Sequence, residues 1–237
     1  MPRPPSCGTC SGVPLVRASP DLAIYAVHAA FWGAFAITQR LSAAGRAAPA
    51  PASPASAIAA PATARYSRLV LAVHFVAFGV MYMGVGAAVI SGRVPAWFPG
   101  QRIVGTLVIA AGACLMCWAL VYFRSWRFRA KLDAGHELAT GGPFALVRHP
   151  IYAGLDLLAL GTAVWVPTWL TWAAVVLMVL GSDLRGRAEE GVLREAFGEA
   201  YRTYCARTRR FIPGLYCATP VRSRHARGSS RDQAATV

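Results

Sequence analysis

The residues of this sequence that could do chemistry concentrate between His136 and Tyr204. One motif reads Arg148-His149-Pro150-Ile151-Tyr152-Ala153-Gly154, and a second, Arg187-Ala188-Glu189-Glu190, follows a long apolar run. A third, Phe197-Gly198-Glu199-Ala200-Tyr201, comes shortly afterwards. Imidazole, phenol, guanidinium and carboxylate groups therefore stand at both ends of a hydrophobic segment. Such a pattern is typical of a membrane protein that places polar chemistry beside lipid.

Composition and charge also indicate a membrane protein. The chain is 56% hydrophobic and 14% charged, whereas a soluble domain carries about 25% charged residues. The formal net charge is +14, and arginine supplies every cation except Lys131. Such an excess suits a nucleic acid or an anionic membrane surface. Long uncharged runs favour the lipid bilayer, and we expect no nucleic-acid partner because no groove-reading motif accompanies the charge.

We expect an all-α integral membrane fold with about five transmembrane helices. Residues 21–40 form the first, and Leu69–Ser91 and Ile103–Phe123 are two clearer spans. The run Ile151–Ser182 would be about 48 Å long as one helix, too long for a hydrocarbon core of about 30 Å. Pro167 near its middle therefore predicts a C-terminal helical hairpin that supplies the last two spans.

Amino-acid composition predicts how the rest of the chain is organised. We expect an irregular N-terminal tail over 1–20, a flexible Ala/Pro/Ser linker over 41–67, a membrane domain over 68–217 and a disordered basic tail over 218–237. Apolar positions recur at helical spacing from Leu184 to Cys205, which predicts an amphipathic helix on the cytoplasmic side. Lys and Arg are concentrated on the side that holds the C-terminus, so that side is predicted to be cytoplasmic.

The hairpin should bring the first two motifs together at one membrane interface. Pro150 suits the first turn of a helix, which makes His149 its cap residue. Glu189 and Glu190 follow the return of the chain to the same side. Asp156 lies deep in the apolar run, where a carboxylate is either functional or hydrogen-bonded to another helix. Carboxylates beside aromatic rings suit a cationic, zwitterionic cofactor such as S-adenosylmethionine.

The ordered motifs over about 136–213 resemble the isoprenylcysteine carboxyl methyltransferase family, and related phospholipid methyltransferases share part of the pattern. The resemblance implies a membrane-embedded, S-adenosylmethionine-dependent methyltransferase with a lipophilic methyl acceptor. A catalytic arginine that faces the substrate maps to Arg185 or Arg187, and Asp156 is a further candidate for contact with the substrate. Gly191 replaces the longer acidic run of many eukaryotic members. The implied cofactor site comprises His136, Glu137, Leu138, Ala139, Phe144, His149, Pro150, Ile151, Tyr152, Glu189 and Glu190.

Several alternatives stay open at this point. A carboxylate acceptor needs no general base, whereas an amine or thiol must lose a proton, for which His149, Tyr152 and Asp156 are candidates. His28 and His74 in apolar spans could instead ligate haem, and a non-catalytic membrane scaffold is a third class of function. The lone pair of cysteines near the N-terminus has no second pair at zinc spacing, so no metal site is predicted.

Overall fold

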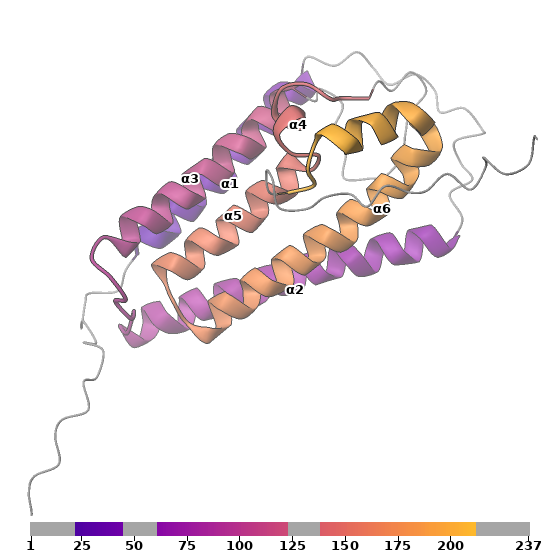
Figure 1. The fold of residues 1–237 in the computed structure, drawn as a ribbon. Coiled ribbons are helices and arrows are strands. Elements are labelled where there is room, and N and C mark those ends of the chain that lie inside the picture. Colours follow the sequence, from indigo (N-terminus) through magenta and orange to yellow (C-terminus); the bar gives the residue numbers. More distant parts are fainter. Residues whose placement is uncertain (1–21, 45–60, 123–137, 212–237) are drawn as a thin grey trace, which may run out of the picture.

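The computed structural model describes residues 22–44, 61–122 and 138–211, and of residues 43–44 and 61–69 only the backbone. These ranges contain five long helices and one short helix and no strand (Figure 1). The helices are α1 Ala23–Ala44, α2 Pro61–Ser91, α3 Gln101–Tyr122, α4 Pro143–Leu146, α5 Pro150–Trp165 and α6 Trp169–Arg207. The prediction of an all-α fold is confirmed for this part of the chain.

Two helices have the length and apolar composition needed to cross a membrane, Val70–Ser91 within α2 and α3. Large apolar side chains on their outer faces support this assignment, since Ile90 is 89% exposed and Ile103 67% exposed. Such side chains facing outward are expected where the surroundings are lipid rather than water. The five-span count, the domain boundaries over 1–237 and the cytoplasmic orientation stay predictions.

Several helix ends differ from the sequence prediction. Helix α1 continues to Ala44 and α2 begins at Pro61, so both ends of the expected linker 41–67 are helical. Alanine-rich sequence favours helix, and proline is well suited to a first helical turn. Helix α2 ends where predicted, because Gly92 adopts φ +61° and the N–H groups of Gly92 and Arg93 donate to the carbonyls of Val89 and Ala88.

The hairpin region consists of α5 and α6, joined by Val166, Pro167 and Thr168. Thr168 caps α6: its hydroxyl accepts from the Thr171 N–H, and the Thr171 hydroxyl accepts from the Thr168 N–H. Gln101 ties this end of the bundle together, since its side-chain amide donates to the carbonyls of Pro95 and Trp165. The loop before α3 is thus fixed to the end of α5.

Helix α6 is not the single amphipathic helix that its apolar spacing predicts beyond Leu184. Gly198 has φ +50° and ψ −117°, which interrupts the helix, and Figure 1 shows the chain turning back there. A side chain rarely adopts this conformation, so glycine permits the turn. The residues after Gly198 therefore lie over the start of α5 instead of extending away from it.

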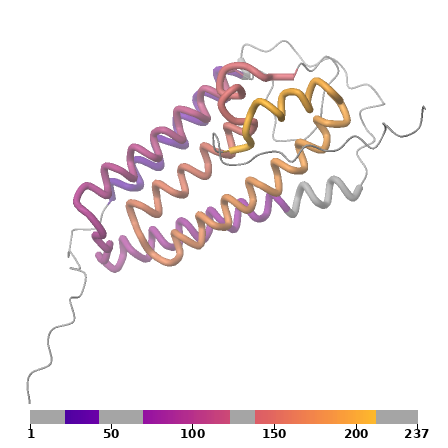
Figure 2. The backbone as a smooth tube through the Cα atoms, viewed as in Figure 1, coloured from indigo at the N-terminus to yellow at the C-terminus, as the bar shows by residue number. Residues whose placement is uncertain are grey.

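Glycines set the distance between the antiparallel helices α3 and α5. A Cβ atom at Gly105 would lie 2.7 Å from the carbonyl oxygen of Gly161, and one at Gly112 would lie 2.7 Å from that of Gly154. The reciprocal distances are 2.6 and 2.8 Å. The two backbones therefore touch at two places, as in close helix pairs within membranes. The tube in Figure 2 shows α5 lying between the α1–α3 pair and the α2–α6 pair.

Candidate functional site

The site begins at the N-terminus of α5, as the motif predicts. His149 occupies the cap position and Pro150 the first turn. The backbone N–H groups of Arg148 and His149 donate to the carbonyls of Arg209 and Arg210, at 2.7 and 3.2 Å. These bonds join the start of α5 to the segment that follows α6. The turn at Gly198 makes this contact possible.

Glu190 lies at the centre of a cluster of three arginines. Its side chain is fully buried. Arg148 donates to Oε1 from Nε at 3.1 Å and from Nη2 at 2.9 Å, and Arg210 donates to both carboxylate oxygens at 2.8 Å. Arg194 donates to Oε2 at 2.7 Å from a half-exposed position. Burial would raise the pKa of Glu190, but His149 and the arginines hold it well below its usual range.

Glu189, by contrast, lies between the arginine cluster and the membrane helices. Its Oε1 accepts a hydrogen bond from the Tyr152 hydroxyl and lies 3.4 Å from Arg185 Nε. Its Oε2 lies 3.5 Å from His149 Nδ1. Burial opposes ionisation of Glu189, yet His149, Tyr152 and Arg185 lower its pKa. The Glu189 side chain remains 26% exposed, which leaves this carboxylate accessible to a ligand.

His149 lies between the two carboxylates. Its Nε2 is 3.5 Å from Glu190 Oε1, buried and without a geometrically sound hydrogen bond within the described part of the chain. Burial would lower the pKa of His149, but Glu189 and Glu190 together raise it. The imidazole stacks on the ring of Tyr152 with 5.8 Å between centroids and lies 5.7 Å from that of Phe211.

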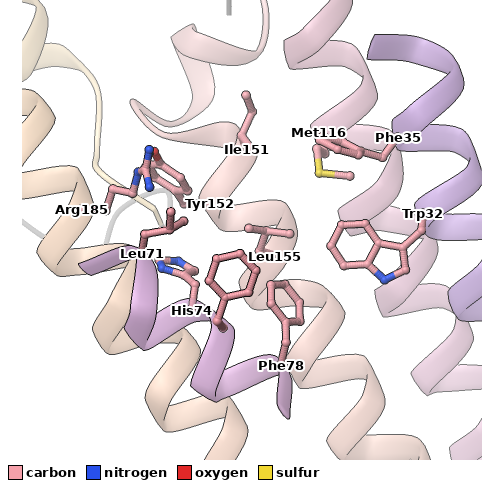
Figure 3. A pocket seen from close by; sticks show the side chains of 11 residues that line it. Trp32, Phe35, Leu71, His74, Phe78, Met116, Ile151, Tyr152, Leu155 and Arg185 are labelled. Carbon is pink, nitrogen blue, oxygen red and sulfur yellow. The ribbon is translucent and has the colours of Figure 1, made fainter. Parts of the chain in front are cut away.

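Arg185 connects these groups to an apolar cavity. Its Nε donates to the Tyr152 hydroxyl at 2.7 Å, and its guanidinium carbon lies 5.7 Å from the Tyr152 ring centroid. Both residues line a cavity of about 220 Å³ among α1, α2, α3, α5 and α6. Figure 3 shows Arg185 and Tyr152 on one side of this cavity and Trp32, Phe35 and Met116 on the opposite side. A polar chain therefore leads from the cavity to His149.

The structure separates the two candidate arginines. Arg185 is buried and lines the cavity, whereas the Arg187 side chain is 64% exposed and pairs with Asp183 at 2.6 Å. The geometry therefore favours Arg185, and the predicted role of Arg187 beside the substrate is inconsistent with its position. Asp156 accepts a hydrogen bond from Ser182 at 2.8 Å and is outside the cavity lining. This contact corresponds to the interhelical alternative for Asp156.

The other candidate cofactor residues have varied positions. His136 and Glu137 lie outside the described residues. Leu138 and Ala139 precede α4 and are half-buried, and Phe144 lies in α4, where its carbonyl accepts from Tyr204 at 2.6 Å. Among the residues around His149, the predicted site also includes Pro150, Ile151 and Tyr152, which are all buried.

Several residues of the site were missed by the sequence analysis. Arg210 binds Glu190 only because the chain reverses at Gly198, and no local pattern signals that reversal. Arg148 is part of the first motif, and this position in the sequence could have identified it as a residue of the site. Trp32 and His74 reach the cavity from α1 and α2, whose sequences carry no motif.

The chain is similar to known methyltransferases in sequence and in fold. Residues 101–200 match the family model described as phospholipid methyltransferase. Curated proteins from Oryza sativa subspecies indica and japonica, each named probable protein-S-isoprenylcysteine O-methyltransferase, are 31% identical over 121 residues. That match covers 49% of this chain and spans 62% of the length of each relative.

A solved structure has a similar fold. The eukaryotic intramembrane Ras methyltransferase ICMT, an isoprenylcysteine carboxyl methyltransferase, superposes with a TM-score of 0.55 at 18% identity. The match covers 86% of this chain and 71% of that protein. The resemblance predicted from the motifs is confirmed as a similarity: the chain resembles isoprenylcysteine O-methyltransferases in sequence over 121 residues and ICMT in fold. This neighbour is described as an intramembrane protein, and the described part of the present chain has two helices that are long and apolar enough to cross a membrane.

Proposed function

We propose that this chain is a membrane-embedded, S-adenosylmethionine-dependent methyltransferase whose acceptor is a carboxylate on a lipophilic molecule, as in isoprenylcysteine O-methylation. The observation that carries the proposal is the apolar cavity beside Arg185 and Tyr152, joined through Glu189 to His149. An apolar tail fits the cavity, and a carboxylate suits the charge of Arg185. The acceptor class rests on the names of the relatives and on this chemistry.

The residues present fit the methyl donor in part. S-adenosylmethionine supplies an electrophilic methyl group on a cationic sulfonium. Glu189 offers a partly exposed carboxylate beside the rings of His149 and Tyr152, a combination that favours cationic groups. Glu190 is fully buried, and three arginines bind its carboxylate. We therefore assign donor binding to Glu189 and a positioning role to Glu190.

Methylation of a carboxylate requires orientation more than proton transfer. The acceptor oxygen attacks in line, so the protein must hold the carboxylate, exclude water and balance its charge. Arg185 is fixed for this task because Tyr152 accepts its Nε–H and in turn donates to Glu189. His149, paired with two carboxylates, holds the α5 end of the same chain of groups in place.

A phospholipid amine is the second candidate acceptor, favoured by the family model that matches residues 101–200. An ammonium acceptor must lose a proton before it can attack, and His149 and Tyr152 are the titratable groups beside Glu189. The positive charge of Arg185 does not favour binding of an amine acceptor. Variants of Arg185 and Arg187 therefore also distinguish between the two acceptors.

Donor binding is tested by calorimetric titration of S-adenosylmethionine into detergent-purified protein. We expect Glu189→Ala to weaken binding at least tenfold, because it removes a charged partner of the ligand. Glu199→Ala is the matched control, since Glu199 is exposed and pairs only with Arg202 among the described residues. Absence of binding to well-folded wild type would refute the proposed function.

Acceptor orientation is tested by methyl transfer to N-acetyl-S-farnesylcysteine. We expect Arg185→Ala to lower kcat/KM by roughly 100-fold, the loss of one charged interaction in a desolvated site. Arg187→Ala, a surface change of the same type, should stay within about twofold. Equal effects of the two changes would remove Arg185 from its role, and transfer to phosphatidylethanolamine that survives Arg185→Ala would indicate an amine acceptor.

A further inference from the structure

We propose that Trp32 limits the length of the acceptor's apolar chain and that a buried hydrogen-bond chain through Tyr82, His28 and Thr162 holds its indole in place. This inference rests on the proposed function, because it treats the cavity as the site of the acceptor tail. It adds a specificity-determining residue from α1, a helix that precedes the segment matched by the family model.

Trp32 forms the wall that faces the polar end of the cavity. In Figure 3 it lies across the cavity from Arg185 and Tyr152. A tail whose head group is held at Arg185 therefore points toward the indole. Phe78 stands beside Trp32, with 5.4 Å between ring centroids, and also lines the cavity. The far wall is thus aromatic and closely packed.

The hydrogen bonds behind Trp32 form a chain with one consistent direction. The Thr162 hydroxyl donates to the Leu158 carbonyl at 2.6 Å, so it can only accept from His28 Nε2, 3.0 Å away. In the neutral imidazole, His28 Nδ1 is then the unprotonated nitrogen and accepts from the Tyr82 hydroxyl at 3.1 Å. The Tyr82 oxygen accepts the indole N–H of Trp32 at 2.8 Å.

This chain joins α1, α2 and α5, three of the helices that line the cavity. Both ring nitrogens of His28 form hydrogen bonds to residues of other helices, which favours a structural role between helices over haem ligation for this residue. In an apolar interior each unsatisfied polar group is costly, so rotation of the indole away from Tyr82 is opposed. Phe31 and Phe35 hold the indole from other sides, at 5.3 and 5.9 Å between centroids.

The size of the cavity sets the expected chain length. An apolar cavity of about 150 Å³ binds benzene, which has six carbon atoms, so a cavity of about 220 Å³ holds on the order of nine carbon atoms. That is close to the two isoprene units of a geranyl chain and short of the three units of a farnesyl chain. A longer chain must displace Trp32 or leave the cavity past Phe75, which lines the cavity and is 67% exposed.

The test is equilibrium competition among N-acetylcysteine thioethers that carry prenyl, geranyl, farnesyl or geranylgeranyl chains. A labelled geranyl thioether is bound to the full-length protein in detergent without methyl donor, and each competitor is added at the same mole fraction in the micelle. Because the micelle is as apolar as the cavity, the comparison reports fit rather than transfer from water. Wild type should prefer geranyl over geranylgeranyl by about tenfold, the scale of an overpacking cost.

Trp32→Ala should shift the preferred chain by at least one isoprene unit, since the indole's volume becomes available to the ligand. Tyr82→Phe removes one oxygen and is the milder variant: it should reduce the geranyl preference about threefold by releasing the indole. Trp118→Ala is the matched control, because Trp118 lies on α3, is 47% exposed and does not line the cavity. It should leave the length profile unchanged.

An unchanged profile in both Trp32→Ala and Tyr82→Phe would overturn the proposal, as would a wild type that binds no thioether or binds geranylgeranyl best. Titration of S-adenosylmethionine in parallel separates this outcome from failure of the proposed function. Donor binding with an unchanged profile refutes the role of Trp32 alone. A shifted profile without donor binding supports the role of Trp32 and refutes the methyltransferase.

Discussion

Glu190→Gln tests whether the arginine cluster holds the site together. The substitution keeps the shape of the side chain and removes its charge. Arg148 and Arg210 make four hydrogen bonds to this carboxylate, and their side chains are 6% and 19% exposed. Loss of one member of a buried ion pair costs about 3–5 kcal/mol, because the remaining charges stay buried without compensation.

The expected loss is large enough to measure directly. For a chain of this size, about 1 kcal/mol corresponds to a change in Tm of about 2–4 °C. We therefore expect Glu190→Gln to lower the Tm of the detergent-solubilised protein by at least about 6 °C, followed by tryptophan fluorescence. Arg194→Ala is the matched control. Its half-exposed pair with the same carboxylate should contribute about 0.3–0.5 kcal/mol, or about 1–2 °C.

A second readout tests the location of the effect. The segment around Arg210 should detach from the start of α5, so limited proteolysis should cut the variant after Gly198 faster than it cuts wild type. A Tm change under about 2 °C, or one equal to that of Arg194→Ala, would refute the conclusion that Glu190 anchors this segment.

Three further predictions concern pH and glycine. Glu189 and Glu190 raise the pKa of His149 above 6.5 against the effect of burial. The protonated imidazole therefore stabilises the fold fully below about pH 6.5, and this stabilisation is lost as the pH rises through the pKa of His149 in the folded protein. His149→Gln should remove that alkaline decline from a plot of Tm against pH, and an identical decline in the variant would contradict the prediction. Gly112→Ala should destabilise the folded protein by about 1–3 kcal/mol, because the new Cβ atom meets the Gly154 carbonyl. Gly79 has open space around it, so Gly79→Ala should be neutral or stabilising. Thermal unfolding of both variants tests this difference. Gly198→Ala should lower the stability of the folded protein by about 1–2 kcal/mol. The new Cβ atom meets no neighbouring side chain or helix within 4 Å, so the loss arises from the backbone conformation at φ +50°. An unchanged Tm would show that the turn relaxes.

Local chemistry made part of this structure predictable. Proline has a fixed φ and no N–H, so Pro150 indicated the start of α5 with His149 as its cap. Uninterrupted apolar sequence indicated helices α2 and α3, with ends correct to within a few residues except at Pro61. These features depend on residues close in sequence, which is why composition and spacing suffice to find them.

Other features depend on contacts between distant segments. The helical spacing of apolar residues continues across Gly198, so periodicity alone hid the reversal of the chain. The burial of Glu190 follows from that reversal, because Arg210 reaches it only afterwards. Which of Arg185 and Arg187 faces the cavity depends on the rotation of α6 against α2 and α5, and the spacing to Glu189 is compatible with either.

The two ends of the segment 147–210 contact each other, and this contact separates the segment from the rest of the protein. Arg148 and Arg210 share Glu190, and Val147 pairs with Arg209, so residues 147–210 form a ring closed without a covalent bond. The ring itself contains every group that connects Arg185 to His149. The opposite wall of the cavity comes from helices outside the ring. Under the proposed function, the groups that carry the reaction lie within the ring, and the wall that selects the acceptor lies outside it. Changes in α1 and α2 would then alter the choice of lipid acceptor while the ring stays intact.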